Sequence, residues 1–282
     1  MALETTLTSA HAWSPDLTAV TPADAVPDAL ILQTSTVAGT IEGDAPLVRV
    51  QYVDDATASF TAEGTLIAAA DPGLSEVAVA TGKVAQVIQL SREQWVQPNA
   101  SELLAASVAR AVTKAGNAAY IAQPAPTSPA ITPPAGLLNI TGIVDGGAVA
   151  DDLDALVDLL ATLATNGATS SHIVISPTAW ASLRKFKTGV DYNSSLLGVG
   201  ATDAQKYLLD LPVLVSPAVP ADSGLVLDNT AVVSAVGPVQ VMNSEHAFFA
   251  QDSIAIRCTW RFGANVVKPN RIGKFTVTPP AA

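Results

Sequence analysis

Apolar residues recur at three- and four-residue steps between residues 99 and 121, and this stretch has the strongest pattern in the chain. The apolar positions are Leu104, Val108, Ala111, Val112, Ala115 and Ala119. This spacing places them along one face of an α-helix. Asn99 suits the N-cap, Glu102 completes a capping box, and Pro124 follows the pattern. We predict one long helix over residues 99–121, with an Ala-rich face suited to packing closely on a sheet.

Shorter patterns predict further helices and many strands. A short helix is expected over residues 22–32, a second from residue 151 to the Asn166-Gly167 pair, and a third after Ser176-Pro177. In the second, the expected apolar stripe is Leu153, Leu156, Val157, Leu160 and Leu163. Strands are predicted at residues 47–53, 84–90, 172–175, 211–215, 225–227, 231–236, 239–244, 253–262 and 266–277. The mixture predicts an α+β fold.

Residues 55–80 have the pattern of a long hairpin. Strand-like pieces at residues 59–62 and 76–80 flank an uncharged stretch, with turn signals at Gly64 and Pro72-Gly73. An isolated two-stranded hairpin is marginal in water. We therefore expect it to lean on its own body or on a neighbouring molecule.

Composition narrows the functional classes. Charged residues make up 14% of the 282 residues, against about 25% in an average domain, and this favours large contacts between subunits. An ordinary Ala-rich globular enzyme is the alternative. The net charge of −11 excludes broad neutralisation of nucleic-acid phosphates. We see no secretory signal and no apolar run long enough for a membrane span, and we expect a cytoplasmic origin.

Candidate chemistry is sparse. The three histidines, His11, His172 and His246, are far apart in the sequence and have no metal-ligand spacing. The single cysteine, Cys258, allows no intrachain disulfide and is expected in the core. Neither a nucleophile elbow nor a P-loop nor a zinc-helix motif is present. We therefore predict no catalytic, cofactor or metal site and no enzymatic activity.

The co-linear order of five segments carries a resemblance to a known family. The segments cover residues 58–91, 99–112, 173–187, 211–230 and 247–277. Together they resemble the major capsid proteins of tailed phages, which have the Hong Kong 97-type fold. The resemblance implies a shell subunit with an N-terminal arm, an extended E-loop hairpin, a P-domain with a long spine helix, and an A-domain.

Domain boundaries follow from this resemblance. It implies an N-terminal arm and first P-domain strand at residues 1–54, and an E-loop at 55–80. The P-domain follows at 81–136 with its spine helix at 99–121, then most of the A-domain at 137–245, and a return to the P-domain sheet at 246–282.

The resemblance also implies partners and contacts. Copies of the chain would form hexamers and pentamers in an icosahedral or prolate head that encloses the genome of a double-stranded DNA phage, without sequence-specific DNA binding and without a membrane. The head would assemble in the host cytoplasm. A separate scaffolding protein is expected, because only about 98 residues precede the spine helix, together with a portal and a possible decoration protein. The candidates for intersubunit contact are Phe60, Glu63, Leu66, Ile67 and Arg92.

Some members of this family join their subunits by a Lys–Asn isopeptide bond that a nearby Glu catalyses. This chain departs from that pattern. The hairpin tip has no lysine, the nearest being Lys83 at its base, while Asp252 stands where the asparagine would be and Thr259 where the glutamate would be. We therefore expect no autocatalytic crosslinking.

Three other functions compete with the phage head. An encapsulin-like compartment would have the same fold with a cargo enzyme inside, and DNA content would separate the two. A soluble α/β enzyme with a dispersed site would be a monomer or small oligomer. A β-rich tail or adhesin module is disfavoured by the long central helix.

Overall fold

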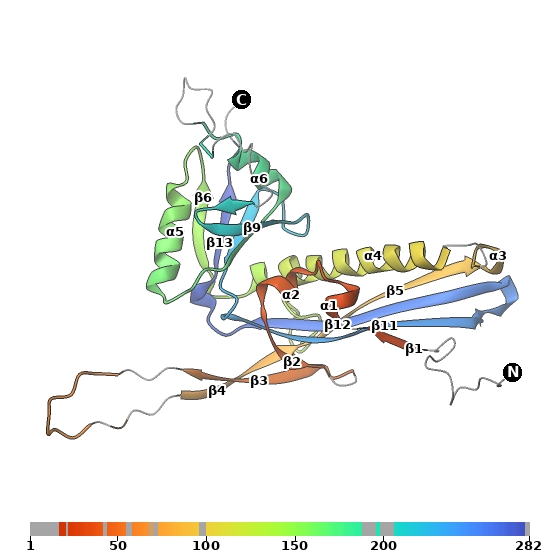
Figure 1. Cartoon of the computed structure of the whole chain (residues 1–282), viewed down its shortest axis with the longest axis horizontal. Helices are drawn as coiled ribbons and strands as arrows, with labels where there is room; N and C mark the ends of the chain where they lie inside the picture. Colours follow the sequence, from red (N-terminus) through yellow and green to blue (C-terminus); the bar gives the residue numbers. More distant parts are fainter. Residues whose placement is uncertain are drawn as a thin grey trace, which may run out of the picture.

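The computed structural model describes residues 17–20, 22–41, 44–54, 58–67, 69, 73–95, 100–187, 196–197 and 206–279. These residues form an elongated body, a second lobe standing on it, and a hairpin that projects from the body (Figure 1). Helices accompany sheets in which most strand pairs are antiparallel, so the predicted α+β fold class is confirmed.

The elongated body is a five-stranded sheet covered by helices. Its strands are β1 (Leu17–Val20), β2 (Thr36–Thr40), β5 (Gly82–Ser91), β11 (Val232–Phe248) and β12 (Ser253–Val266). The order is β1-β11-β12-β5, with β2 running parallel to another part of β11. Its helices are α1 (Pro22–Ala25), α2 (Leu30–Thr34), α3 (Arg92–Trp95) and α4 (Ala100–Ala122). Helix α4 runs along β5 and β12 (Figure 1).

Helix α4 confirms the predicted long helix to within one residue at each end, although its expected N-cap, Asn99, lies outside the described residues. Its buried side includes Val108, Val112 and Tyr120, whereas Ala115, expected in the apolar stripe, is exposed. Helix α4 approaches the sheet closely at Gly116, where a Cβ would lie 2.6 Å from the ring of Trp260. A small residue at this point lets the helix backbone rest on the indole.

The second lobe is a six-stranded sheet with two helices. Its order is β6 (Val144–Val149), β13 (Gly273–Val277), β10 (Ser223–Leu227), β7 (His172–Ile175), β9 (Leu211–Val215) and β8 (Tyr207–Leu208). Helices α5 (Asp154–Thr165) and α6 (Pro177–Leu183) pack on it. Short 3₁₀ turns occur at η1 (Leu137–Asn139), η2 (Phe249–Gln251) and η3 (Pro269–Arg271).

The ends of these two helices follow local chemistry. Ser176 caps α6, its Oγ accepting a hydrogen bond from the Ala179 backbone N–H at 3.2 Å. Gly167 takes φ +78° just beyond α5, as the predicted C-cap requires. The predicted stripe of α5 is wrong at Val157, which is 47% exposed, while Leu159 is buried. Leu159 fills the space left by Gly146 and Gly273, since a Cβ on either would lie within 3 Å of it.

The two lobes share one hydrophobic core. Val174 and Leu225 from the six-stranded sheet belong to the same cluster of buried residues as Val112 of α4 and Trp260 of β12. The buried carboxylate of Asp228, where β10 leads into β11, accepts hydrogen bonds from the backbone N–H groups of Thr169 and Thr230 at 3.0 and 2.9 Å. The junction between the lobes is therefore packed and hydrogen-bonded.

The projecting hairpin consists of β3 (Leu47–Asp54) and β4 (Gly73–Ala80), paired antiparallel from Leu47↔Ala80 to Asp54↔Gly73. It corrects two expectations. The strand at 47–53, assigned to the sheet of the long helix, forms the hairpin instead. The strand expected at residues 59–62 is absent, because these residues belong to an irregular tip.

Three other expectations are corrected. The strands predicted at 231–236 and 239–244 are one strand, β11, with an irregular register between Val236 and Val239. The helix expected at 22–32 is divided into α1 and α2 by a turn at Pro27 and Asp28. The last segment was expected to return to the sheet of the long helix as a strand from 266 to 277. Residues 253–266 do pair in that sheet, but the next strand starts at Gly273 and joins the six-stranded sheet.

Candidate intersubunit surfaces

The tip of the hairpin presents apolar side chains to solvent. Phe60 and Leu66 are almost fully exposed, and Ile67 is 76% exposed. Glu63 is also exposed and precedes Gly64, whose φ of +76° forms the turn. These four are sequence-predicted contact residues, and the structure gathers them in one tip that extends well beyond the body (Figure 1). Large apolar side chains in such a cluster mark a surface that another molecule can cover.

The root of the hairpin is held firmly. The Ala80 carbonyl oxygen faces Gly263 of β12, where a Cβ would lie only 2.0 Å from it. The Asn265 side-chain amide donates to the Ala78 carbonyl at 2.9 Å. Val79 is fully buried in a small cluster with Ile41 and residues of β11. The direction in which the hairpin leaves the body is therefore fixed by contacts with β11 and β12.

Arg92, the fifth predicted contact residue, lies elsewhere, where α3 begins beside the β11–β12 turn. Its Nε donates to Asp252 Oδ1 at 2.9 Å, and Glu245 Oε2 lies 3.9 Å from Nη1. The hydrogen bond to Asp252 raises the pKa of the Arg92 guanidinium. Arg92 therefore has partners within its own chain, while about half of its side chain stays accessible.

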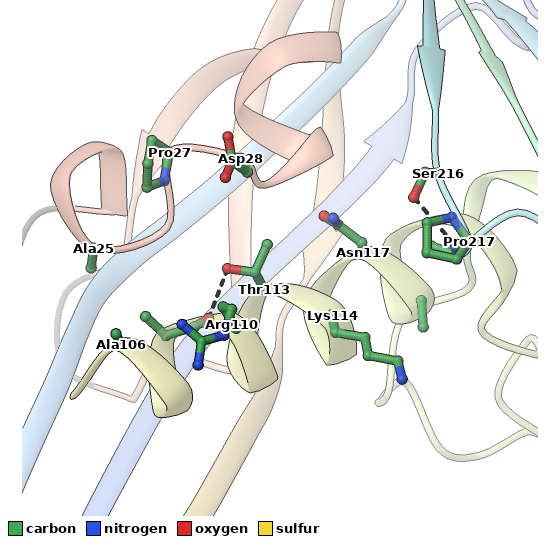
Figure 2. A pocket seen from close by; sticks show the side chains of 13 residues that line it. Ala25, Pro27, Asp28, Ala106, Arg110, Thr113, Lys114, Asn117, Ser216 and Pro217 are labelled. Atoms are coloured by element: carbon green, nitrogen blue, oxygen red, sulfur yellow. Dashed lines mark hydrogen bonds between the residues drawn. The ribbon is translucent and has the colours of Figure 1, made fainter. Parts of the chain in front are cut away.

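A groove of about 550 Å³ lies between α4, the α1–α2 turn and the loop after β9. Figure 2 shows Arg110, Thr113, Lys114 and Asn117 on α4, across from Pro27 and Asp28. Ser216 and Pro217 close the third side. The sequence pattern places Arg110 and Lys114 one turn apart and off the apolar stripe, but only the fold shows which segments lie opposite them.

Of the three positions relevant to crosslinking, Lys83 and Thr259 lie together and Asp252 lies apart from them. Lys83 and Thr259 line one small hollow with Asp44. Asp252 precedes β12, seven residues from Thr259, which corresponds to roughly 24 Å along a strand. One carboxylate oxygen of Asp252 already accepts a hydrogen bond from Arg92.

Among the described residues, no three His, Cys, Asp or Glu side chains gather as metal ligands would. His246 is exposed, His172 is half-buried at the start of β7, and His11 lies outside the described residues.

Cys258 is buried, as predicted, and burial raises the pKa of its thiol. Burial also raises the pKa of Tyr120, whose hydroxyl lies 2.9 Å from that of Thr34. The backbone N–H of Gly147 lowers the pKa of Asp145. These groups lie on different elements and form no common site. None of the described helices combines the length and apolar character that a membrane span requires.

Comparison with solved structures gives matches along almost the whole chain. The capsid of a native GTA particle has a TM-score of 0.67 at 17% identity, covering 99% of this chain and 95% of that one. The Mycobacterium phage Bobi structure has a TM-score of 0.65 at 16% identity, covering 89% and 90%. The Gordonia phage Cozz structure has a TM-score of 0.63 at 15% identity, covering 98% and 91%. At these identities the matches establish the fold, which is the expected Hong Kong 97-type capsid fold.

No curated protein matches the chain. The sequence does match the phage capsid family, from residue 26 to residue 277. The match includes the hairpin, helix α4 and both sheets except for strand β1. The chain therefore belongs to the phage capsid family, the shell proteins of phage heads.

Proposed function

We propose that the chain is the major capsid protein of a tailed double-stranded DNA phage, and that its copies assemble into hexamers and pentamers of a closed head without autocatalytic crosslinks. The observation that carries this proposal is the hairpin, which exposes Phe60, Leu66 and Ile67 far from the body yet is rigidly held at its root. Covering these side chains on a neighbouring copy would make a heterologous contact, the kind that closes into rings.

The parts of the fold correspond to domains in this proposal. The β3–β4 hairpin with its tip is the E-loop, longer at its start than the 55–80 expected from the sequence. The five-stranded sheet with α4 as spine helix is the P-domain. The six-stranded lobe is the A-domain, and it includes β13. The N-terminal arm is proposed within residues 1–54, as expected from the sequence, and residues 1–16 of it lie outside the described residues. Phe60, Glu63, Leu66, Ile67 and Arg92 remain the proposed intersubunit contacts.

Shell strength in this proposal comes from non-covalent contacts or from a decoration protein. The family's reaction needs a lysine, an asparagine and a catalytic carboxylate. Here the positions aligned with the last two hold Asp252 and Thr259, and a threonine hydroxyl cannot serve as the carboxylate base. A scaffolding protein and a portal complete the assembly in the host cytoplasm. Enclosed DNA is not bound by sequence, in keeping with the net charge of −11.

Co-expression of the chain with a candidate scaffolding protein encoded by a neighbouring gene tests the proposed function. We expect size-exclusion chromatography and negative-stain electron microscopy to find capsomer rings or closed shells. A subunit that stays monomeric at high concentration and with that protein present would contradict the proposal and favour a soluble enzyme. Particles from infected cells should contain nuclease-protected DNA, whereas an encapsulin-like compartment would contain a cargo protein.

Mature particles test the absence of crosslinks. On denaturing gels after boiling, we expect a single band at the monomer mass of 28.7 kDa. A ladder of heat-resistant multimers would contradict the expectation, and its loss in a Lys83→Arg variant would identify the lysine. The same gel of freshly assembled shells is the control, because crosslinks would accumulate only during maturation.

A further inference from the structure

The groove beside α4 has a basic wall without charge partners of its own. Arg110 and Lys114 are exposed and line the groove one helical turn apart. Unlike Arg49, Arg92 and Arg261, they form no ion pair in the described part of the chain. The protein has 14 Lys and Arg against 25 Asp and Glu. Arg110 and Lys114 therefore place two positive charges one helical turn apart on a chain whose net charge is −11.

All three sides of the groove are fixed before any ligand arrives. Ile31 from α2, Val112 from α4 and Val219 after the third wall are buried in one core cluster. Asn117 Oδ1 accepts a hydrogen bond from the Leu30 backbone N–H at 2.8 Å, which ties the start of α2 to α4. A preformed groove lowers the ordering cost of binding.

The floor and the opposite wall define the ligand further. Alanine and proline side chains, among them Ala106, Ala109 and Pro217, provide a shallow apolar surface. Asp28 lies across from the two cations and is exposed (Figure 2). A DNA backbone carries a phosphate at every nucleotide and no hydrogen-bond donors, so it would place phosphates against Asp28 as well as against the two cations. A polypeptide brings side-chain carboxylates for the cations and backbone N–H groups for Asp28.

We propose that this groove binds an acidic segment of a second protein that joins the shell during or after assembly. The proposal rests on the proposed shell function and deepens it by assigning the chemistry of one partner. Acidic side chains two residues apart in an extended segment are about 7 Å apart. This spacing is close to the 5–6 Å between Cβ atoms one turn apart on a helix. Such a segment can therefore place one carboxylate near Arg110 and the next near Lys114.

The probe is a short fluorescein-labelled peptide of alternating glutamate and alanine, with glutamine in place of glutamate in the control peptide. We expect the unassembled subunit to bind only the acidic peptide in fluorescence anisotropy. The double variant Arg110→Gln, Lys114→Gln loses both ion pairs to the peptide and should weaken binding about tenfold, because each exposed ion pair contributes a factor of about three. Glutamine is a good helix former, so α4 should be retained. Circular dichroism checks this.

The double variant Lys185→Gln, Lys206→Gln is the matched control, because it removes two exposed positive charges outside the groove. It should bind the acidic peptide as the wild type does. Equal binding by both double variants, or no binding of the acidic peptide by the wild type, overturns the proposal. A mixed-sequence DNA oligonucleotide that binds through Arg110 and Lys114 while the peptide does not would assign the groove to nucleic acid and also overturn it.

Assembly is measured separately on the same variants. If Arg110→Gln, Lys114→Gln prevents the chain alone from forming capsomers and leaves peptide binding unchanged, the occupant is a second copy and the proposal is wrong. If the wild type never assembles but binds the peptide through these two residues, the shell function fails while the acidic-segment site stands.

Discussion

Replacing Phe60, Leu66 and Ile67 together by serine is expected to leave the subunit folded but unable to form capsomers or shells. The three side chains project from the tip and are between 76% and fully exposed, so the isolated subunit loses almost no internal contact. Surface changes of this kind alter the free energy of unfolding by about 0.5 kcal/mol or less. Thermal unfolding of the unassembled variant should therefore match the wild type.

The loss of assembly follows from the apolar area that a neighbour would cover. Burying one large aliphatic or aromatic side chain contributes about 1.5–3 kcal/mol. Three such side chains contribute on the order of 5 kcal/mol per contact, so the serine variant should associate more than about a thousandfold more weakly. Sedimentation velocity and electron microscopy measure this directly.

A conservative triple variant separates apolar area from other effects. Phe60→Leu, Leu66→Ile and Ile67→Leu keep large apolar side chains at all three positions, and we expect capsomers to form. Shells from the serine variant at wild-type concentration would mean that the tip makes no essential contact. Loss of assembly in both variants would instead indicate a contact that depends on side-chain shape.

Gly263→Ala is expected to have the largest effect on the stability of the subunit. The new methyl group would lie 2.0 Å from the Ala80 carbonyl oxygen, and this neighbour is backbone that cannot rotate away. Either β12 or the end of β4 must move, and overpacking of this kind costs about 3 kcal/mol. The midpoint of thermal unfolding should fall by at least about 5 °C.

The Gly263→Ala variant should also assemble poorly, because Ala80 is the last residue of the hairpin and its displacement turns the whole hairpin. Thr259→Ala is the control on the same strand, since its side chain faces a surface hollow and not backbone. It should unfold within about 0.5 kcal/mol of the wild type. A wild-type melting temperature for Gly263→Ala would show that the contact between Gly263 and the Ala80 carbonyl does not constrain the root of the hairpin.

The sequence predicted elements well where short-range rules decide them. The 3.6-residue period of α4 and the Ser176-Pro177 start of α6 are local signals, and both helices are confirmed. Strand β7, a short apolar strand bounded by polar residues, was also predicted correctly. The prediction of the capsid family was also correct, because it followed from the order of elements and did not depend on any single boundary.

The errors occur where pairing partners decide the structure. Gly237-Pro238 has the pattern of a break, and β11 nevertheless continues through it. The proline is tolerated because β2 pairs with β11 up to Val236 and β1 begins to pair at Val239, so no partner on that side needs its missing N–H. Likewise, nothing within residues 47–53 indicates that their partner is β4 and not the sheet of the long helix.

The two candidate surfaces differ in the same way, because local sequence predicts one of them and not the other. The exposed tip could be inferred from turn signals and an uncharged stretch. The groove could not, because its walls come from residues near 27, 113 and 217 that only the folded chain brings together. The close contact of Gly263 with Ala80 could not be predicted either, since a glycine in a strand pattern does not identify which backbone approaches it.

The core that Val174 and Leu225 share with Val112 and Trp260 has a mechanical consequence. The two lobes cannot rotate against each other without opening this core, so each subunit behaves as a stiff plate. The hairpin is a two-stranded ribbon anchored at one end, and it is the compliant part. In a shell of such plates, internal pressure would be taken up by bending at the seams, while the plates themselves keep their shape.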